Sequence, residues 1–328
     1  MKTKCMKINL FAALLWAWSQ SVAALDEIRV GYFYEWPAPA LVAQAKNLFE
    51  QALGIPVHWI AYETSYDFNR ALHNGEIQIA FSHEIIPFME GVAAGLDAFI
   101  TGIAVTYPDY DLCVAHEESA INVDDPHSFS GKTIATMKGT ISHLRAIKTM
   151  EILGVDPQSI NYTYRGYGAS VAKALHRHHA DIGCAYGGPL RVMYRVGEAI
   201  IDGIQLEKYG IKLFDVISMS GSFVKHHKLL AKKFMRVVDS QNRQYLETPD
   251  AMKKDLSDTS NLKIVITHRL LKLLNFLTVE QQLSQDWLGH HGDVVRYMNN
   301  LGQFLSNHDK LSHALTDYSR VIDTSLLE

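Results

Sequence analysis

Residues 27–61 read EIRVGYFYEWPAPALVAQAKNLFEQALGIPVHWIA, and this stretch decides the fold class. Apolar residues alternate with other residues over 27–33, which predicts a β-strand. Residues 40–53 have the spacing of an amphipathic helix, and residues 56–61 predict a second strand. A strand, a helix and a strand of this size form a βαβ unit, so the chain is expected to contain a mainly parallel sheet.

The alternation of strands and helices continues along the chain and restarts after residue 107. The predicted strands are 78–81, 98–105, 132–136, 160–164, 182–186 and 213–219, and the helices between them are 65–74, 86–94, 142–153 and 171–178. The rest of the chain predicts helices at 229–247, 267–274, 279–288 and 293–306. Two successive α/β series and a helical tail indicate two α/β lobes, with ligand expected at the carboxyl ends of the strands.

The N-terminus has the pattern of a cleavable signal peptide. A basic start is followed by an apolar run over residues 8–18 and by small residues at 21–24. The apolar run is shorter than the roughly 20 residues that span a bilayer, which argues against a membrane anchor. We therefore expect residues 1–24 to be removed, with cleavage near Ala24, and the mature chain to be periplasmic.

Composition and charge exclude several classes of function. The net charge is −4, with 48% hydrophobic and 20% charged residues, as in globular proteins. Acids and bases are mixed along the chain, so there is no basic patch to neutralise the phosphates of a nucleic acid. The sequence contains no Walker loop and no G-x-S-x-G elbow, and it predicts no cofactor.

Histidine-rich segments occur at 176–179, 226–227 and 290–291. They lack a companion cysteine and the H-x-x-x-H spacing of zinc sites, so the sequence predicts solvated histidines and no metal site.

Two cysteines follow the predicted cleavage site, Cys113 and Cys184, and each lies in an apolar, strand-like run. If the two runs are neighbours in one sheet, an oxidising compartment permits a disulfide between them. Two separate buried thiols are equally compatible with the sequence, because spacing alone does not supply the geometry of a disulfide.

Six short motifs follow one another along the mature chain. They are VAQAKN (42–47), RALHNGEIQI (70–79), GKTIA (131–135), FDV (214–216), QFL (303–305) and DYS (317–319). Their order and spacing resemble the taurine-type branch of the periplasmic binding proteins, a family that includes receptors for other alkanesulfonates and for nitrate.

The resemblance implies a type II periplasmic-binding fold. Lobe I would comprise residues 25–108 and 217–328, lobe II residues 109–216, and two chain segments would form the hinge. The implied function is that of the substrate-binding protein of an ABC importer. Such a protein holds taurine or a similar small sulfonate between its lobes and delivers it to the permease subunits. It is not an enzyme.

The sulfonate end of such a ligand is best held by N–H groups at the start of a helix. Lys138-Gly-Thr-Ile-Ser-His143 is an entry of this kind, and Thr140, Ser142 and His143 are its candidate ligands. A Ser or Thr at this place is also an ordinary helix cap. The counterparts in the first lobe are expected in the loops after the second and third strands, namely Thr64, Ser82 and His83.

The ammonium end of the ligand needs a carboxylate or aromatic faces. Glu35 and Asp215 are the candidate acids, and Trp36 and Tyr186 the candidate aromatic walls. A carboxylate contributes about 1.5–3 kcal/mol, more than the roughly 0.5–2 kcal/mol of a cation over a ring. For Asp215 the alternative is a hinge residue, and for Trp36 it is core packing.

Three departures from the family pattern keep other functions open. The first loop contains Glu35-Trp36-Pro37, the third strand ends in FSHE (81–84), and Tyr186 stands where other members tend to carry Trp. An acid among aromatic residues could instead bind betaine- or choline-like cations. An enzyme resembling thiamine-pyrimidine synthases, with His83 or His143 as general base, is disfavoured by the signal peptide.

Overall fold

The structure is a computed structural model that describes residues 25–33 and 37–328. The predicted signal peptide (1–24) and the candidate ligands Glu35 and Trp36 lie outside the described residues. Within the described part, no helix is long and apolar enough to cross a membrane.

The first five-stranded sheet, sheet A, has the order β2-β1-β3-β10-β4. Its strands are β1 (Ile28–Tyr32), β2 (Val57–Ala61), β3 (Ile79–Glu84), β4 (Ala98–Thr106) and β10 (Phe214–Ser220). β1 runs parallel to β2 and β3, whereas β10 runs antiparallel to β3 and β4. Helices α1 (Pro39–Ala45), α2 (Leu48–Leu53), α3 (Ser65–His73) and α4 (Ile85–Ala93) connect the first four strands.

The second sheet, sheet B, has the order β7-β6-β8-β5-β9. Its strands are β5 (Asp111–His116), β6 (Thr133–Thr136), β7 (Asn161–Tyr164), β8 (Ile182–Tyr186) and β9 (Gly197–Ala199). β6 is parallel to β7 and β8, and β5 is antiparallel to β8. The accompanying helices are α5 (Ile141–Ile152), α6 (Gly168–His176), α7 (Gly188–Met193) and α8 (Gly203–Lys208).

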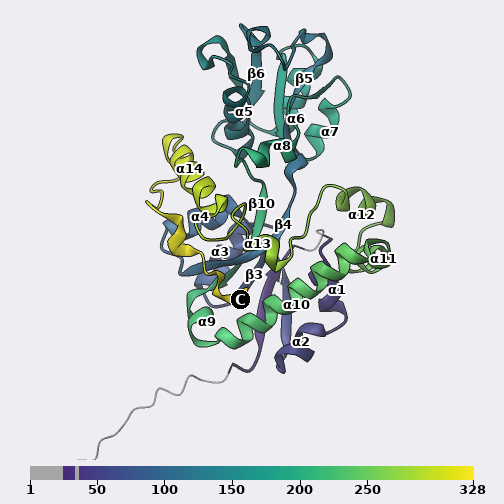
Figure 1. Ribbon diagram of the computed structural model, residues 1–328, viewed down its shortest axis with the longest axis vertical. Coiled ribbons are helices and arrows are strands. Elements are labelled where there is room, and N and C mark those ends of the chain that lie inside the picture. The colour runs from purple at the N-terminus through teal and green to yellow at the C-terminus, as the bar shows by residue number, and fades with distance from the viewer. Residues whose placement is uncertain (1–24, 34–36) are drawn as a thin grey trace, which may run out of the picture.

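Figure 1 shows the two sheets in separate bodies, with sheet B and its helices at the top. Each body has its own cluster of buried apolar side chains. We call sheet A with the helices packed on it lobe I, and sheet B with α5 to α8 lobe II. The two α/β lobes confirm the prediction that was made from the order of strands and helices.

The chain crosses between the lobes at two adjacent places. It leaves β4 through the 3-10 turn Pro108–Tyr110 and returns into β10. The two crossings are hydrogen-bonded, because Tyr107 N–H donates to the Leu213 carbonyl at 3.1 Å. All of β10 belongs to sheet A, so we propose that lobe II ends before Phe214 rather than at residue 216.

The C-terminal part is helical, as the sequence predicted, and its helices pack on lobe I. Its helices are α9 (Gly221–His226), α10 (Lys228–Glu247), α11 (Pro249–Thr259), α12 (Ile264–Leu271), α13 (Val279–Gln282) and α14 (Asp293–Asn307). Gln282 joins the tail to the sheet, because its side-chain oxygen accepts from Ile103 N–H at 2.8 Å. α14 also reaches toward lobe II (Figure 1), and this contact bears on the site below.

Several details of the predicted elements are wrong. The single helix expected over residues 40–53 is two helices, because Asn47 takes a left-handed conformation (φ 53°) that asparagine tolerates better than most residues. The third strand continues to Glu84 because its last residues pair with β10. The helices α8, α9 and α11 and the short strand β9 were not predicted at all, and the helix expected over residues 279–288 ends at Gln282.

Candidate functional site

The carboxyl ends of the parallel strands of both sheets lie beside the crossings. In sheet A, Glu84 at the end of β3 pairs with Asp215 at the start of β10. In sheet B, Tyr186 at the end of β8 pairs with Asp111 at the start of β5. Strands parallel to β3 and β8 end on the same sides, so the structure gathers most of the predicted ligands on the hinge side of the two lobes.

Lobe I contributes two acids to this region. Asp215 is buried and accepts a short hydrogen bond from the Tyr107 hydroxyl. Burial raises its pKa well above the usual value, and the neighbouring Glu84 raises it further. Glu84 itself is exposed, although partial loss of water raises its pKa, against a hydrogen bond from Ser65 that lowers it. Two nearby carboxyl groups with raised pKa values favour a cation between them.

The sequence predicted that Ser82 and His83 lie in a loop, but the structure places both inside β3. The reason is the pairing with β10, which begins about 130 positions later along the chain. Ser82 has a left-handed backbone (φ 64°) where the register of β10 shifts, and its buried hydroxyl has no hydrogen-bond partner among the described residues.

His83 is fully buried in lobe I. Its Nδ1 is hydrogen-bonded to the Ser218 hydroxyl at 2.8 Å, and the rings of Phe68 and Phe88 meet it edge to face. Burial lowers the pKa of His83 to about 3, so the imidazole is neutral at physiological pH. Because the ring does not reach solvent, it is a poor candidate for a general base.

Thr64 and Thr140 both act as helix caps. Thr64 accepts from Asp67 N–H at 3.3 Å at the start of α3 and lies exposed. Thr140 accepts from His143 N–H at 3.3 Å at the start of α5, and its hydroxyl donates to the Met137 carbonyl at 2.7 Å. For these two side chains the structure supports the capping interpretation.

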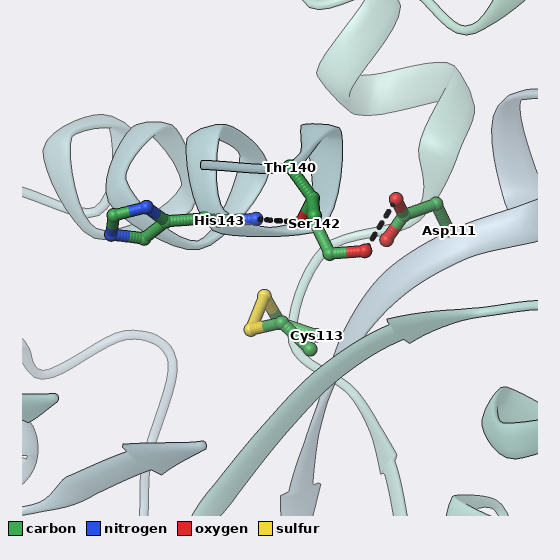
Figure 2. Close-up of a disulfide and its surroundings, with 6 residues drawn as sticks. Asp111, Cys113, Thr140, Ser142 and His143 are labelled. Atoms are coloured by element: carbon green, nitrogen blue, oxygen red, sulfur yellow. Dashed lines mark hydrogen bonds between the residues drawn. A yellow bond between two sulfur atoms is a disulfide. The ribbon is translucent and has the colours of Figure 1, made fainter. Parts of the chain in front are cut away.

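Lobe II places a buried polar group in the first turn of α5. The Ser142 hydroxyl donates to Oδ2 of Asp111 at 2.8 Å, as Figure 2 shows, and both side chains are buried. Arg145 lies three residues further along the same helix face and is fully buried. Burial raises the pKa of Asp111 to about 6, although Arg145 and Ser142 both act to lower it.

Arg145 and Tyr297 were missed by the sequence analysis. One terminal nitrogen of Arg145 donates to the Pro108 carbonyl at 3.0 Å, in the first crossing. Tyr297 comes from α14 of lobe I and interacts electrostatically with Arg145. The only available signal was the i, i+3 spacing of Arg145 from Ser142, because the contact with α14 spans about 150 residues of sequence.

Several buried polar atoms near the crossings have no hydrogen-bond partner in the described part of the chain. They are Ser82 Oγ, Asp111 Oδ1, Thr136 Oγ1, the Nε and one terminal nitrogen of Arg145, and the Tyr297 hydroxyl. Buried polar groups are normally hydrogen-bonded, so a concentration of unpaired ones marks a place where a polar ligand or water is expected.

The tail of lobe I covers the start of α5. The ring of His143 stacks on His308 with centroids 4.9 Å apart and contacts Phe304 of α14. Gly139 N–H donates to His143 Nδ1 at 3.2 Å, and Tyr164 is hydrogen-bonded to Nε2 at 3.3 Å. Burial, with His308 and Lys138 nearby, lowers the pKa of His143 to about 4. His143 therefore joins the lobes as a neutral ring.

Tyr186 ends β8 with 53% of its surface exposed, beside the crossing. The backbone next to it is fixed, because Gly187 N–H donates to the Tyr110 carbonyl at 2.9 Å. Of the predicted ligands in lobe II, Tyr186 is the one most open to an incoming molecule.

The structure joins Cys113 and Cys184 in a disulfide, one of the two alternatives that the sequence left open. The two residues are directly opposite each other in the β5–β8 ladder, with a sulfur–sulfur distance of 2.06 Å. Figure 2 shows the bridge beneath the start of α5, close to Ser142 and Asp111. It ties together the two strands that carry Asp111 and Tyr186.

A surface hollow of about 530 Å³ lies elsewhere, along α10 and the C-terminal residues. Arg243, one of its two lining arginines, is already paired with Asp239 and Glu280. We assign this hollow no role in the site at the crossings.

Comparison with known proteins finds that the chain is similar to several periplasmic binding proteins. It is 22% identical to the taurine-binding periplasmic protein of Escherichia coli strain K12 over 98% of both chains. The crystal structure of the periplasmic aliphatic sulphonate binding protein SsuA from Escherichia coli matches with a TM-score of 0.67 and 15% identity, over 93% of this chain and 99% of that one. A periplasmic sulfonate-binding protein from Methylobacillus flagellatus KT matches with a TM-score of 0.69 and 13% identity, over 92% and 93%.

These matches show the two-lobed periplasmic-binding-protein fold that the sequence predicted. Residues 37–252 match the family described as NMT1/THI5 like, and this range is well over half of the chain. The chain belongs to the NMT1/THI5-like family.

Proposed function

We propose that this protein is the extracytoplasmic substrate-binding protein of an ABC importer and that it binds taurine or a similar small sulfonate zwitterion between its lobes. The family, the fold and the name of the 22% identical relative support the general function. The choice of a zwitterion rests on the residues around the crossings.

The observation that carries the proposal is the opposite chemistry of the two lobes at this place. Lobe I presents Asp215 and Glu84. The pKa values of both carboxyl groups are raised, and no basic residue acts to lower either pKa. Lobe II presents the start of α5 and the buried Arg145, whose Nε and one terminal nitrogen have no hydrogen-bond partner in the described residues. An ammonium group suits the acids, and a sulfonate suits the N–H groups and the guanidinium.

The ligand would enter while the lobes are apart and would be held as they close about residues 107–111 and 213–215. Hinge closure of this kind is the usual motion of two-lobed binding proteins. The closed form would present a surface to the permease subunits at the inner membrane. Export to the periplasm depends on the predicted signal peptide, residues 1–24.

A thermal-shift and calorimetric screen tests the ligand. Purified mature protein is measured with taurine, hypotaurine, alkanesulfonates, nitrate, betaine and choline. A ligand at a hundred times its dissociation constant stabilises the protein by about 2.7 kcal/mol. We expect taurine or another aminosulfonate to give the largest shift. A shift with betaine and none with any sulfonate would contradict the proposal.

A quaternary-ammonium ligand is the second candidate, and one observation favours it. The rings of Tyr107 and Tyr110 pack edge to face with centroids 5.9 Å apart, and the Tyr107 hydroxyl bonds to Asp215. Aromatic rings beside a carboxylate suit a choline-like cation. The same screen separates the two candidates, because choline lacks the acidic group that the start of α5 would hold.

We propose binding without catalysis. The histidines considered as general bases, His83 and His143, are buried and neutral. Proton NMR of the bound ligand after prolonged incubation with the protein checks this point: an unchanged spectrum is expected, and the appearance of a product would contradict it.

A further inference from the structure

Three side chains that commonly bind metals meet on lobe II: His116, Glu118 and His178. One potential ligand atom of each lies within 4.8 Å of those of the other two. The imidazole rings of His116 and His178 have centroids 3.8 Å apart, and Nε2 of His178 lies 3.2 Å from a carboxylate oxygen of Glu118. A simple histidine–carboxylate pair accounts for only two of these three groups.

The fold holds the three residues together by way of the β5–β8 ladder. β5 ends at His116, whose N–H donates to the Asp181 carbonyl just before β8. His178 lies in the turn that leads from α6 into β8 and has a left-handed backbone (φ 55°), which is uncommon for a residue other than glycine. Residues 62 positions apart therefore present their side chains at one place.

The spacing fits a tetrahedral site. Ligands that each lie about 2 Å from one ion are about 3.3 Å apart in tetrahedral geometry. The 3.2 Å between His178 and Glu118 agrees with this, and these two exposed side chains can adjust toward His116, since the ligand atoms of all three lie within 4.8 Å of one another. Two histidines and one carboxylate, with an open fourth position, are a common ligand set for zinc.

We propose that His116, Glu118 and His178 form a binding site for one zinc-like divalent cation, with water as the fourth ligand. Glu118 and His178 are exposed and accessible to an ion, whereas His116 is only 5% exposed and supplies the fixed side of the site. Glu118 N–H donates to Nδ1 of His116 at 3.1 Å, so an ion that takes this nitrogen replaces one hydrogen bond on an exposed turn, where water can solvate the freed N–H.

The proposed site is at the end of β5 away from the crossings. Asp111 begins β5 beside the crossing and His116 ends it, five residues or about 17 Å further along the strand. A bound cation would tie the end of β5 to the α6–β8 turn without touching the residues proposed to bind the sulfonate. Failure of either proposal therefore leaves the other intact.

The test uses the mature protein with any histidine tag removed. Zn²⁺ binding is measured by calorimetry, and the visible absorption of bound Co²⁺ reports tetrahedral coordination. We expect one ion per chain, and at least a ten-fold loss of affinity (roughly the loss seen even for outer-shell changes) in His178→Gln and in Glu118→Gln. His176→Gln is the matched control, since His176 is an exposed histidine on the same helix end but outside the cluster.

Both cluster variants change exposed side chains, so their folding is checked by circular dichroism rather than assumed. Equal Zn²⁺ affinity in wild type, His178→Gln and Glu118→Gln would overturn the proposal. So would an equal loss in His176→Gln, because this result would indicate unspecific binding by surface histidines.

Discussion

The hinge-side ends of the two sheets have the same topology but opposite chemistry. In lobe I, β3 and β10 bring together two acids, Glu84 and Asp215. No basic residue acts to lower the pKa of either carboxyl group. In lobe II, β8 and β5 bring Asp111 next to Ser142 and the buried Arg145, so that its charge is balanced. For the ligand that we propose between the lobes, this difference favours one orientation, with the cationic end toward lobe I.

The lobes also differ in how they are stabilised. Lobe I has the larger apolar cluster, to which the C-terminal helices add, whereas lobe II has a smaller cluster and a disulfide. A covalent link that closes a long loop restricts the unfolded chain and so compensates for a smaller core.

Removal of the disulfide is expected to have the largest effect, and to act on lobe II alone. The bridge closes a loop with a sequence separation of 71 residues, for which chain entropy predicts a loss of about 4 kcal/mol in Cys113→Ala/Cys184→Ala. Hydrogen exchange followed by mass spectrometry checks this: protection should fall in β5 to β8 and persist in β1 to β4. Uniform loss over both lobes would show that they do not differ in this way.

Acid should destabilise lobe I through His83. The unfolded chain protonates this histidine below about pH 6.5, whereas the folded protein keeps it neutral down to about pH 3. The unfolded state therefore binds more protons in this window, and His83 makes the free energy of unfolding fall by about 1.4 kcal/mol per pH unit as the pH decreases.

The measurement compares urea unfolding of wild type and His83→Asn between pH 7 and pH 5. Asparagine keeps a polar group near Ser218 but does not titrate, so the variant should lose less stability on acidification. His176→Asn, at an exposed position, serves as the control and should behave like wild type. Identical slopes for wild type and His83→Asn would mean that His83 is not the source of acid sensitivity.

Loss of the α5 cap should have a smaller effect. Thr140→Ala removes the bond to His143 N–H and is expected to cost about 1 kcal/mol, measured by urea unfolding. Because Thr140 serves the helix rather than the ligand, taurine affinity should change little at a temperature where the variant is folded. A large loss of affinity without loss of stability would make Thr140 a ligand contact and strengthen the anionic end of the comparison.

The fold was predictable because its signals are local. Alternation of apolar residues in 27–33 and helical spacing after it are properties of short segments, and they repeat in both lobes. The disulfide required one further fact, the opposite placement of Cys113 and Cys184 in the ladder, and the sequence left this open. The predicted third strand ended too early because its partner β10 is distant in sequence, and a pairing between distant strands has no local signal.

The candidate site was only partly predictable. Asp215, Ser142 and Tyr186 lie near the crossings, where the strand order places them. Arg145 and Tyr297 were missed because their burial results from packing between α5 and α14, which no local pattern encodes. The roles of Glu35 and Trp36 remain predictions.

The orientation of the ligand is tested most directly by comparing two ligands on one variant. Calorimetry gives the affinities of wild type and Asp215→Asn for taurine and for ethanesulfonate, which lacks the amine. Loss of a charge-assisted bond of about 1.5–3 kcal/mol should weaken taurine binding by roughly 10- to 150-fold and leave ethanesulfonate almost unchanged. Equal weakening of both ligands, or no weakening of either, would contradict a cationic end held by lobe I.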